Sequence, residues 1–374
     1  MHRGAVADID LDALSHNLNV VRTLSGDRGV IAVVKADAYG HGALGVSGRL
    51  EAEGISCLAV AYTEEALTLR SGGIHSPILV LFDKTDGTEF FEYNLIPVIY
   101  DLDSAVRFSE EARRRNRPLD VHVKVDTGMG RLGLNSENVL DDILAISKMD
   151  SLNIAGLMSH FSDTCFGGDS IAGEQLRKFV ALRERLLPRL KKKVLCHIAN
   201  SAAVLSSSDA GLDAVRPGLM LYGYSPCGAG VHRTANLKPV MRVRTRILTI
   251  RRFRRGTPVS YGGTFVTERE SLIAVLPIGY ADGYGRALSN NADVLIRGKR
   301  APVVGRVCMD LTMADVTEVE GVKEDDEVIL LGSQGGAEIT AHEVAAEAGT
   351  ISYEVLTSLG SRSKRIFKGA AKGI

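Results

Sequence analysis

Eight short apolar runs alternate with longer helical patterns up to Gly223, and this alternation constrains the fold more than any other feature. Amphipathic stretches lie between the runs, among them Glu64–Ser71, Ser104–Arg114 and Gly173–Leu190. Strands that alternate with helices form parallel βαβ units, and continuous apolar strands suit burial on both faces. Eight such units predict a (β/α)8 TIM-like barrel. A doubly wound open sheet is the alternative, but the Gly-rich first turn typical of that fold is absent. The apolar runs are Val30–Lys35, Cys57–Ala61, Pro77–Phe82, Ile96–Tyr100, Asp120–Val125, Ile154–Phe161, Val194–Ala199 and Ala214–Gly223.

The pattern of the sequence changes after Gly223. The segment "YSPCGAGVHRTANLKP" is rich in small and turn-forming residues and is typical of a linker. Beyond it, short alternating runs with turn signals predominate, such as "MRVRTRILTI", "SLIAVLPIGYADGYG" and "DEVILLG". These runs predict a mostly antiparallel β domain, which ends with a helix around Thr340–Ala348 and the segment "SYEVLTSLGSRSKRIF". We therefore expect a barrel over residues 1–230 and a C-terminal β domain over residues 231–374.

The composition excludes several classes of protein. The 374 residues include 45 Lys plus Arg and 45 Asp plus Glu, so the positive and negative charges balance. The chain therefore lacks the excess of positive charge that would indicate binding to nucleic acid or to an anionic membrane. The five cysteines (Cys57, Cys165, Cys196, Cys227 and Cys308) form no CxxC pair, which argues against a disulfide framework and a structural zinc site. We see no secretory signal and no apolar run near the ~20 residues of a membrane span. These features predict a cytoplasmic protein.

Three basic runs also have ordinary structural interpretations. Arg113–Arg115 and Lys191–Lys193 lie in amphipathic patterns and predict solvated helix faces. The four arginines of Arg251–Arg255 stand between two strand-like runs. We interpret them as a polar connection and not as a nucleic-acid-binding patch.

Several nucleotide and hydrolase motifs are missing from the chain. No GxxxxGK[ST] phosphate loop and no GxSxG nucleophile elbow occurs. "GAGVHR" and "GYGRAL" lack the third glycine of a dinucleotide fingerprint. "HEVAAE" (His342–Glu347) has alanine where a zincin has its second histidine. We therefore expect neither a metal site nor an ATP or dinucleotide site.

Basic and hydroxyl residues stand at the carboxyl ends of the predicted barrel strands, where α/β barrels carry their active sites. No carboxylate pair of the glycosidase type accompanies them. Independent structural residues need not all fall at strand ends, so their joint arrangement favours a functional interpretation. The strand-end residues are Lys35, Tyr39, Lys124, Asp126, Arg131, His160, Asn200, Ser201, Arg216 and Gly218.

Taken singly, these residues have structural explanations. Lys35 alone is explained by capping a strand and pairing with Asp37. His160 alone is more often a half-buried core histidine. Arg216 next to a proline is explained by loop stability, and Asp126 is expected to order the backbone amides of its Gly-rich loop.

A lysine on a dry, cationic rim suits chemistry with an aldehyde. Desolvation and neighbouring positive charge lower the pKa of an amine, so more of it is nucleophilic near neutral pH. Hydroxyl groups and glycine amides suit a phosphate. Pyridoxal 5'-phosphate carries both an aldehyde and a phosphate, and it acts as an electron sink that stabilises a Cα carbanion. We therefore expect this cofactor.

The sequence resembles the alanine racemase family, pyridoxal-phosphate enzymes with an α/β barrel and a C-terminal β domain. The resemblance covers nearly the whole chain, and its motifs are highly specific together and in this order, although each alone is weak. The motifs are "VVKADAYGHG", "VKVDTGMGRLG", "MSHF", "IANSAAVL", "VRPGLMLYG", "VSYGGTF", "PIGYADGY", "VGRVCMDLTM" and "ISYEVLTSL".

The resemblance implies two catalytic bases on opposite faces of the substrate. Lys35 would be the Schiff-base lysine and one of the bases. Tyr261 would be the other base and would come from the partner subunit of a head-to-tail homodimer. His160, hydrogen-bonded to Arg216, would assist the tyrosine, and Arg216 would lie against the pyridine nitrogen.

The resemblance also implies the binding residues. Arg131 would contact the phenolic oxygen of the cofactor and the substrate carboxylate. Met309 would offer its backbone N–H to that carboxylate, and Tyr280 would narrow the entrance together with Tyr353. Lys124 would be the lysine that some members carry as a carbamate, braced against Arg131. Tyr39, Ser201, Gly218 and Tyr353 would hold the phosphate of the cofactor, and Asn200 would be a further cofactor-binding residue.

Several functions remain open at this point. The first is an alanine racemase that supplies D-alanine for peptidoglycan. The second is a racemase of the same family acting on serine or on a broad range of amino acids. The third is a non-catalytic pyridoxal-phosphate carrier, although a carrier needs no second base such as Tyr261. A related decarboxylase would be expected to keep an acidic partner for the ring nitrogen, where this chain has Arg216.

Overall fold

The computed structural model describes residues 4–85, 87–163, 170–190, 192–206, 209–226 and 235–369. The chain forms two compact units, and both are discontinuous in sequence. Unit 1 comprises Met1–Leu14, Asp37–Gly42 and Lys238–Ile374, and unit 2 comprises Ser15–Ala36 and Ala43–Leu237. The predicted domain boundary between residues 230 and 231 lies outside the described residues.

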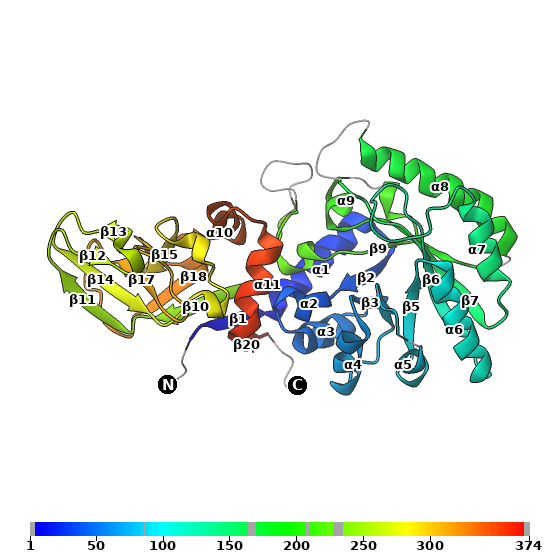
Figure 1. Cartoon of the computed structure of the whole chain (residues 1–374), viewed down its shortest axis with the longest axis horizontal. Helices are drawn as coiled ribbons and strands as arrows, with labels where there is room; N and C mark the ends of the chain where they lie inside the picture. Colours follow the sequence, from blue (N-terminus) through cyan, green and yellow to red (C-terminus); the bar gives the residue numbers. More distant parts are fainter. Residues whose placement is uncertain are drawn as a thin grey trace. The chain divides into compact units, whose positions relative to one another are not determined.

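Unit 2 contains the predicted barrel of eight parallel strands (Figure 1). The strand order is β8-β7-β6-β5-β4-β3-β2-β9, and each neighbouring pair is parallel. A parallel bridge between Asn200 and Arg216 joins the segments that follow β8 and β9, so the two edges of the sheet meet. The strands are β2 (Gly29–Val33), β3 (Cys57–Val60), β4 (Ile78–Val80), β5 (Leu95–Ile99), β6 (Leu119–Lys124), β7 (Leu152–Met158), β8 (Leu195–His197) and β9 (Ala214–Val215).

Helices follow the barrel strands along the chain. The example of α6 (Leu102–Arg114) shows why they form. The carboxylate of Asp101 accepts a hydrogen bond from the Ser104 N–H (2.7 Å) and caps the helix. Ala105, Phe108 and Ala112 then recur at helical spacing and are buried on one face. The other helices are α3 (Ala43–Ala52), α4 (Thr63–Ser71), α5 (Thr88–Glu92), α7 (Val139–Ser147), α8 (Ile171–Leu190) and α9 (Ser201–Ser206), with 3-10 turns η1 (Asp209–Gly211) and η2 (Leu219–Tyr222).

The eighth predicted strand is much shorter in the structure than in the sequence analysis. Only Ala214–Val215 is extended as β9, and η2 follows within the same apolar run. Pro217 has no N–H to donate to a neighbouring strand, so the ladder stops before it. The first run also ends early, because Lys35 begins the short α2 (Lys35–Tyr39) and does not belong to β2.

Unit 1 is built on a mostly antiparallel sheet of seven strands. Its order is β16-β15-β18-β10-β1-β20, with β19 paired to β18. A three-stranded sheet, β11-β14-β17, and the hairpin β12-β13 complete it. The strands are β1 (Val6–Asp10), β10 (Met241–Arg246), β11 (Thr249–Phe253), β12 (Pro258–Val259), β13 (Phe265–Val266), β14 (Ser271–Leu276), β15 (Asp293–Ile296), β16 (Lys299–Pro302), β17 (Thr312–Asp315), β18 (Glu327–Gln334), β19 (Ala337–Ile339) and β20 (Lys364–Lys368).

Short helical elements connect these strands. They are η3 (Tyr261–Gly263), η4 (Tyr280–Asp282), η5 (Arg286–Leu288), α10 (Ala341–Ala348) and α11 (Ser352–Arg362). The helix α1 (Leu11–Ser25) follows β1, and the chain passes from unit 1 to unit 2 within it.

Two features of unit 1 differ from the sequence analysis. The N-terminal strand β1 was not anticipated, and it pairs in parallel with β20 and antiparallel with β10. The interpretation of Arg251–Arg255 as a connection was partly wrong, because Arg251 and Arg252 belong to β11 and pair with β14. The strand β11 lies at the edge of its sheet, where charged side chains are tolerated and prevent pairing with other chains.

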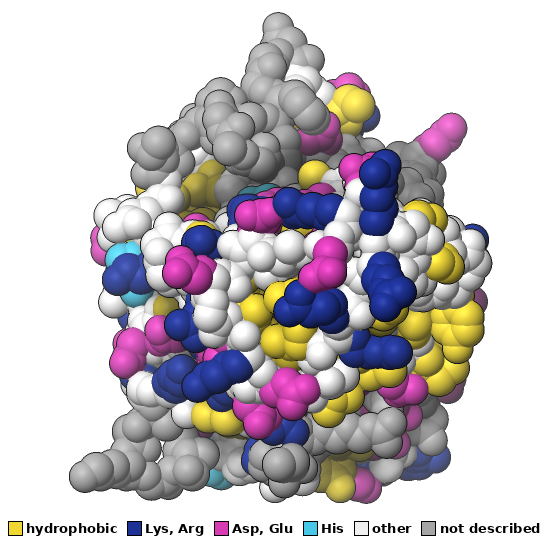
Figure 2. All heavy atoms as spheres, turned by 90° about the vertical axis from the view of Figure 1, so that its left-hand side faces the viewer, with side chains coloured by type: hydrophobic (Ala, Val, Ile, Leu, Met, Phe, Trp, Pro, Cys, Tyr) yellow, Lys and Arg dark blue, Asp and Glu magenta, His cyan; other side chains and the backbone are white. Residues whose placement is uncertain are grey.

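The surface of unit 1 mixes apolar and charged side chains. Figure 2 shows the face of unit 1 that carries β11 and β12, with hydrophobic patches between arginines, lysines and acids. Among the described residues, no helix has both the length and the apolar character needed to cross a membrane.

Candidate active site

Two lysines of unit 2 face the same aromatic ring beyond the carboxyl ends of the barrel strands. The Nζ atom of Lys35 lies 5.6 Å from the centroid of Phe82, and that of Lys124 lies 5.9 Å from it. Lys35 follows β2, Phe82 follows β4, and Lys124 ends β6. The ring of Tyr62 packs edge-on against Phe82, with centroids 6.1 Å apart. The structure therefore brings together two amines that are far apart in sequence.

Burial and positive charge make both lysines easier to deprotonate. Burial, with a smaller contribution from the charge of Arg131, lowers the pKa of Lys35. Burial and the charges of Arg131 and Arg216 lower the pKa of Lys124 to about 8. A neutral amine is nucleophilic, so this rim has the electrostatics expected for covalent chemistry with an aldehyde.

The loop that carries Arg131 is ordered by Asp126, as the sequence analysis expects. The carboxylate of Asp126 accepts backbone hydrogen bonds from Gly128 (2.9 Å), Met129 (2.7 Å) and Arg131 (3.1 Å). These bonds lower the pKa of Asp126 although burial opposes them. Arg131 is thus positioned through its backbone, and its charge acts on both lysines.

Arg216 is almost fully buried and donates to a set of acceptors at the ends of β7 and β8. Its Nη1 donates to Nδ1 (2.6 Å) and to the carbonyl of His197 (2.9 Å). Its Nη2 donates to the carbonyls of Ser159 (2.6 Å) and Ile198 (3.0 Å), and to His160 Nδ1 at 3.3 Å. Within the described residues its Nε–H makes no hydrogen bond.

The donors of Arg216 fix the tautomers of three histidines. A guanidinium can only donate, so His197 Nδ1 must accept and the proton of that ring must lie on Nε2. His197 Nε2 then donates to His122 Nδ1, which lies 2.8 Å away. By the same argument His160 carries its proton on Nε2. A Cβ at Gly156 would clash with the His122 ring, so the glycine makes room for this chain.

The charge of this group resides on the arginine. Burial lowers the pKa of Arg216 to about 9, which leaves it protonated at neutral pH. Burial and the positive charge of Arg216 lower the pKa of His160 and His197 well below the usual range, and that of His122 to about 4. A buried cation is thus surrounded by neutral imidazoles.

Ser201 and Gly218 lie side by side at the ends of β8 and β9. The Ser201 hydroxyl oxygen accepts hydrogen bonds from the Gly218 N–H (2.8 Å) and the Met220 N–H (3.3 Å). The hydroxyl hydrogen is therefore directed elsewhere and can be donated to an anion. The side chain of Asn200 accepts from the Ala203 N–H (3.0 Å), so it stabilises the start of α9.

The remaining predicted residues belong to unit 1, where they form two groups. The rings of Tyr39 and Tyr353 lie 5.9 Å apart. Burial raises the pKa of Tyr39, with a smaller contribution from Tyr353, and burial raises the pKa of Tyr353 to about 12. Both phenols therefore remain neutral hydrogen-bond donors at physiological pH.

Met309 and Tyr280 lie next to each other in the second group. The Tyr280 N–H donates to the Cys308 carbonyl (3.0 Å), and the Ala281 N–H donates to the Met309 carbonyl (3.0 Å). The side chains of Met309 and Tyr280 are 54% and 43% exposed. Large side chains with this exposure are available to another molecule.

Tyr261 projects from a strained turn. It is 71% exposed and begins η3, directly after Ser260, whose φ of 65° and ψ of −175° are a combination normally restricted to glycine. The Ser260 hydroxyl donates to the Arg306 carbonyl (2.7 Å) and holds this conformation. A cavity of about 640 Å³ lies against Tyr261, lined further by Phe253, Ile273 and Leu311.

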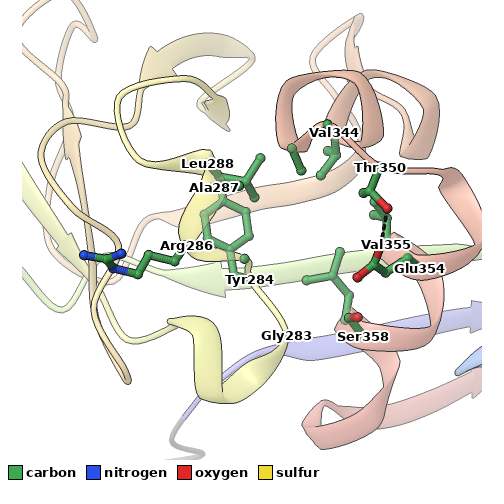
Figure 3. Close-up of a pocket in the computed structure, with 14 residues that line it drawn as sticks. Gly283, Tyr284, Arg286, Ala287, Leu288, Val344, Thr350, Glu354, Val355 and Ser358 are labelled. Carbon is green, nitrogen blue, oxygen red and sulfur yellow. Dashed lines mark hydrogen bonds between the residues drawn. The ribbon is translucent and has the colours of Figure 1, made fainter.

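A second cavity of unit 1, of about 350 Å³, contains none of the predicted site residues (Figure 3). Tyr284, Leu288, Val344 and Val355 line it, and Thr350 donates a hydrogen bond to Glu354 at its edge. Its walls combine apolar side chains with polar ones such as Arg286 and Ser358, and we assign it no role.

The sequence analysis missed three residues of the rim. Phe82 was included in a strand, and its position after β4 was the available signal. His122 lies two residues before Lys124 on β6 and therefore points to the same face of the sheet. His197 ends β8, the position that drew attention to the other strand-end residues.

Three of the five cysteines lie among the described residues. Cys57, Cys196 and Cys308 are free thiols. Cys165 and Cys227 lie outside the described residues. In the described part of the chain, no group of three or more His, Cys, Asp or Glu side chains is arranged to hold a metal ion.

Comparison with known proteins decides the family. The family model described as "Alanine racemase, N-terminal domain" matches residues 9–226, and the model described as "Alanine racemase, C-terminal domain" matches residues 240–367. The chain belongs to the alanine racemase family. The resemblance inferred from the motifs and the barrel-plus-β-domain fold are therefore confirmed.

Individual members of the alanine racemase family match over nearly their whole length. The alanine racemase of Thermodesulfovibrio yellowstonii is 52% identical over 370 residues, which is 98% of each chain. The solved alanine racemase of Clostridium difficile 630 is 34% identical with a TM-score of 0.92, covering 98% of this chain and 96% of that one. The alanine racemase structure from Bartonella henselae, with covalently bound pyridoxal phosphate, is 31% identical with a TM-score of 0.87, covering 98% and 100%.

Proposed function

We propose that this protein is an alanine racemase, an isomerase that uses pyridoxal phosphate to interconvert L- and D-alanine. The observation that carries the proposal is the pair of rim amines, Lys35 and Lys124, whose pKa values are lowered by burial and positive charge. Membership of the alanine racemase family supports it. The covalently bound cofactor of the Bartonella henselae relative supports the choice of cofactor.

The donors of unit 2 fit the cofactor. Lys35 would attach its aldehyde. The Ser201 hydroxyl and the Gly218 backbone would hold the phosphate, with Tyr39 and Tyr353 as further phenolic donors. The uncommitted Nε–H of Arg216 suits the pyridine nitrogen, which is an acceptor when it is unprotonated.

The bound cofactor would supply an electron sink that makes the Cα proton of the amino acid acidic. Racemisation requires that a proton leave one face of Cα and that another arrive on the opposite face. The Nζ of Lys35 would move the proton on one face. The phenolic oxygen of Tyr261 would move it on the other, from the partner subunit, which agrees with the 71% exposure of this side chain.

Neighbouring residues would orient the substrate and assist the bases. His160 has its proton on Nε2 and would offer it to the oxygen of Tyr261. Arg131 and the Met309 N–H would bind the substrate carboxylate. Tyr280 and Tyr353 would narrow the entrance, and Lys124, as an amine or as a carbamate, would be braced against Arg131.

Arg216 gives the site its electrostatic character. It stays protonated at neutral pH, and the histidines around it are neutral. It can therefore donate a hydrogen bond to the ring nitrogen but does not readily transfer a proton to it. A ring nitrogen left unprotonated is a weaker electron sink. This suits a reaction that must return the proton to Cα without side reactions.

The cellular setting follows from the proposed activity. We propose a cytoplasmic homodimer whose two active sites each use both subunits, and whose D-alanine enters peptidoglycan synthesis. The substrate would be a small amino acid.

Deuterium exchange at Cα tests the proposal. The purified protein with pyridoxal phosphate should exchange the α-proton of L-alanine and racemise it, faster than it does L-serine. Lys35→Ala should lose the absorption band of the attached cofactor. Tyr261→Phe should keep that band and lose racemisation mainly in one direction. Serine turning over faster than alanine would favour the broader racemase, and no exchange with any amino acid would favour a carrier.

A further inference from the structure

A left-handed backbone turn follows Lys35. Four consecutive non-glycine residues, 36–39, have φ between 52° and 54°, and Gly40 and Gly42 also have positive φ. L-residues other than Asn and Asp rarely visit this region, and then as single residues. Local preference therefore opposes the turn, and contacts with the rest of the protein must hold it in place.

Hydrogen bonds within the turn close it but do not anchor it. The Gly42 N–H donates to the Asp37 carbonyl (2.9 Å), and the His41 N–H donates to the Ala38 carbonyl (3.0 Å). His41 Nδ1 also lies 3.0 Å from the carbonyls of Ala38 and Tyr39. These bonds involve only neighbouring residues, so they specify the shape of the turn and not its place in unit 1.

Arg365 of β20 connects the turn to the C-terminal part of unit 1. Its guanidinium forms an ion pair with the Asp37 carboxylate (2.5 Å), and its Nε donates to the Gly40 carbonyl (3.0 Å). Its Nη2 also donates to the Gly360 carbonyl (2.7 Å), in the last turn of α11. One side chain thus binds both ends of the turn and the helix on which the turn packs.

The contact between the turn and α11 is a contact of backbones. A Cβ at Gly40 would lie 2.5 Å from the Leu356 carbonyl oxygen, and a Cβ at Gly360 would clash with the Gly40 carbonyl. The turn carries Tyr39 and the start of α11 carries Tyr353, whose rings lie 5.9 Å apart. The position of the turn on α11 therefore sets the geometry of the two tyrosines.

We propose that Arg365 is a positioning residue that holds the left-handed turn against α11 and so places Tyr39 beside Tyr353 for binding of the cofactor phosphate. This inference rests on the proposed function. It assigns a task at the cofactor site to a side chain that does not itself have to touch the cofactor.

Cofactor affinity and hydrogen exchange test the role of Arg365. Arg365→Met should weaken binding of pyridoxal phosphate to the apoprotein by at least roughly tenfold, the loss expected when a charge-assisted hydrogen bond is removed. In the apoprotein, without any cofactor, the amides of His41 and Gly42 should also lose protection against hydrogen exchange. Arg365→Lys, which keeps the charge but not the planar fork, should fall between Arg365→Met and the parent.

Two further variants separate positioning from general stability. Arg269→Met removes an exposed ion pair with Glu318 in the same unit and should change neither measurement. Ala36 is exposed and has a φ of 52°, so Ala36→Gly relieves strain without removing packing. In the Arg365→Met background it should recover part of the cofactor affinity, which a merely structural defect elsewhere would not allow.

The outcomes distinguish this inference from the proposed function. If Ser201→Ala weakens cofactor binding but Arg365→Met leaves both affinity and exchange unchanged, the role of Arg365 is wrong and the proposed function stands. If Lys35→Ala and Ser201→Ala leave cofactor binding intact, the proposed function itself fails. If Arg365→Met does not fold, Asp37→Asn removes the same ion pair from the turn side. An unchanged affinity in that variant overturns the inference.

Discussion

Burial and three neighbouring cations disfavour the charged form of Lys124 in the folded protein. Together they lower its pKa from 10.5 to about 8. Between these two values the unfolded chain binds more protons at Lys124 than the folded chain does. The free energy of unfolding must therefore gain a contribution from Lys124 as pH rises from 8 to 10.5. Below pH 8 both states are protonated and the destabilisation is fully present.

We expect Lys124→Met to show this linkage in the apoprotein. The variant should gain stability relative to the parent at pH 7, and its advantage should shrink as pH rises through 8 to 10. Urea unfolding at a series of pH values measures the difference. Lys148→Met, at an exposed lysine of the same unit, is the matched control. An advantage that stays constant or grows with pH would contradict the shift.

The sequence reveals residue types at the rim more readily than residue environments. Lys35, Lys124, His160 and Arg216 could be identified because each stands at a strand end. Phe82 also follows a strand, but its importance comes from its contacts with two lysines that are distant in sequence, and these contacts become visible only in the structure. The catalytic and binding roles themselves stay predictions until they are measured.

At the scale of elements, the hairpin β12–η3–β13 stores strain immediately before Tyr261. Ser260 occupies a conformation that glycine adopts without penalty, and a non-glycine residue there costs about 1–3 kcal/mol. Its hydroxyl compensates by donating to the Arg306 carbonyl. Two substitutions at this position therefore separate the backbone strain from the hydrogen bond, because both remove the hydroxyl but only one relieves the strain.

Ser260→Ala keeps the strain and loses the hydrogen bond, so the free energy of unfolding should fall by about 1 kcal/mol. Ser260→Gly also removes the hydrogen bond, but it relieves the backbone strain. Its free energy of unfolding should therefore be at least about 1 kcal/mol higher than that of Ser260→Ala. Chemical denaturation of the two variants measures the difference. Equal stabilities would show that the backbone at Ser260 is not strained.

Element prediction succeeded where apolar periodicity is strong and failed where pairing partners are remote. The eight barrel runs and helices such as α6 and α8 follow from burial patterns within the chain. The strand β1 gave no clear signal, because its neighbours β10 and β20 lie more than two hundred residues away in sequence. The strand β9 ends at Val215, shortly before Pro217. The missing N–H of that proline is a local signal, but the long apolar run hid it.

At the scale of the whole molecule, the exposure of Tyr261 and Met309 agrees with active sites shared between subunits. Lys35→Ala and Tyr261→Ala homodimers should each be nearly inactive. If they are mixed and allowed to exchange subunits, half of the dimers become hybrids, and one of the two sites in each hybrid has both bases. Activity should return to about a quarter of the parent level.

A racemase assay before and after subunit exchange checks this prediction. Mixing Lys35→Ala with Lys35→Met provides the control, because no intact site can form from that pair. Sedimentation should show dimers throughout. Failure of activity to return in demonstrably mixed dimers would place both bases in one subunit.

The fold class and the family could be predicted for the whole chain because many weak motifs occur in one order. The chain's division in space could not, because unit 1 draws on the first residues, on Asp37–Gly42 and on the C-terminal third. A sequence read from left to right shows where composition changes. It does not show which N-terminal segments pack against C-terminal segments in the folded protein.

The pairing of β1 with β20 has a consequence for biosynthesis. Residues Val6–Asp10 are synthesised more than three hundred residues before their parallel partner, Lys364–Lys368. At ~5–20 residues per second, this strand waits roughly 20–70 s for its second neighbour. All eight barrel strands are complete well before that. One edge of β1 therefore stays without its native partner until β20 has been synthesised, and an exposed strand edge of this kind is prone to pair with other chains.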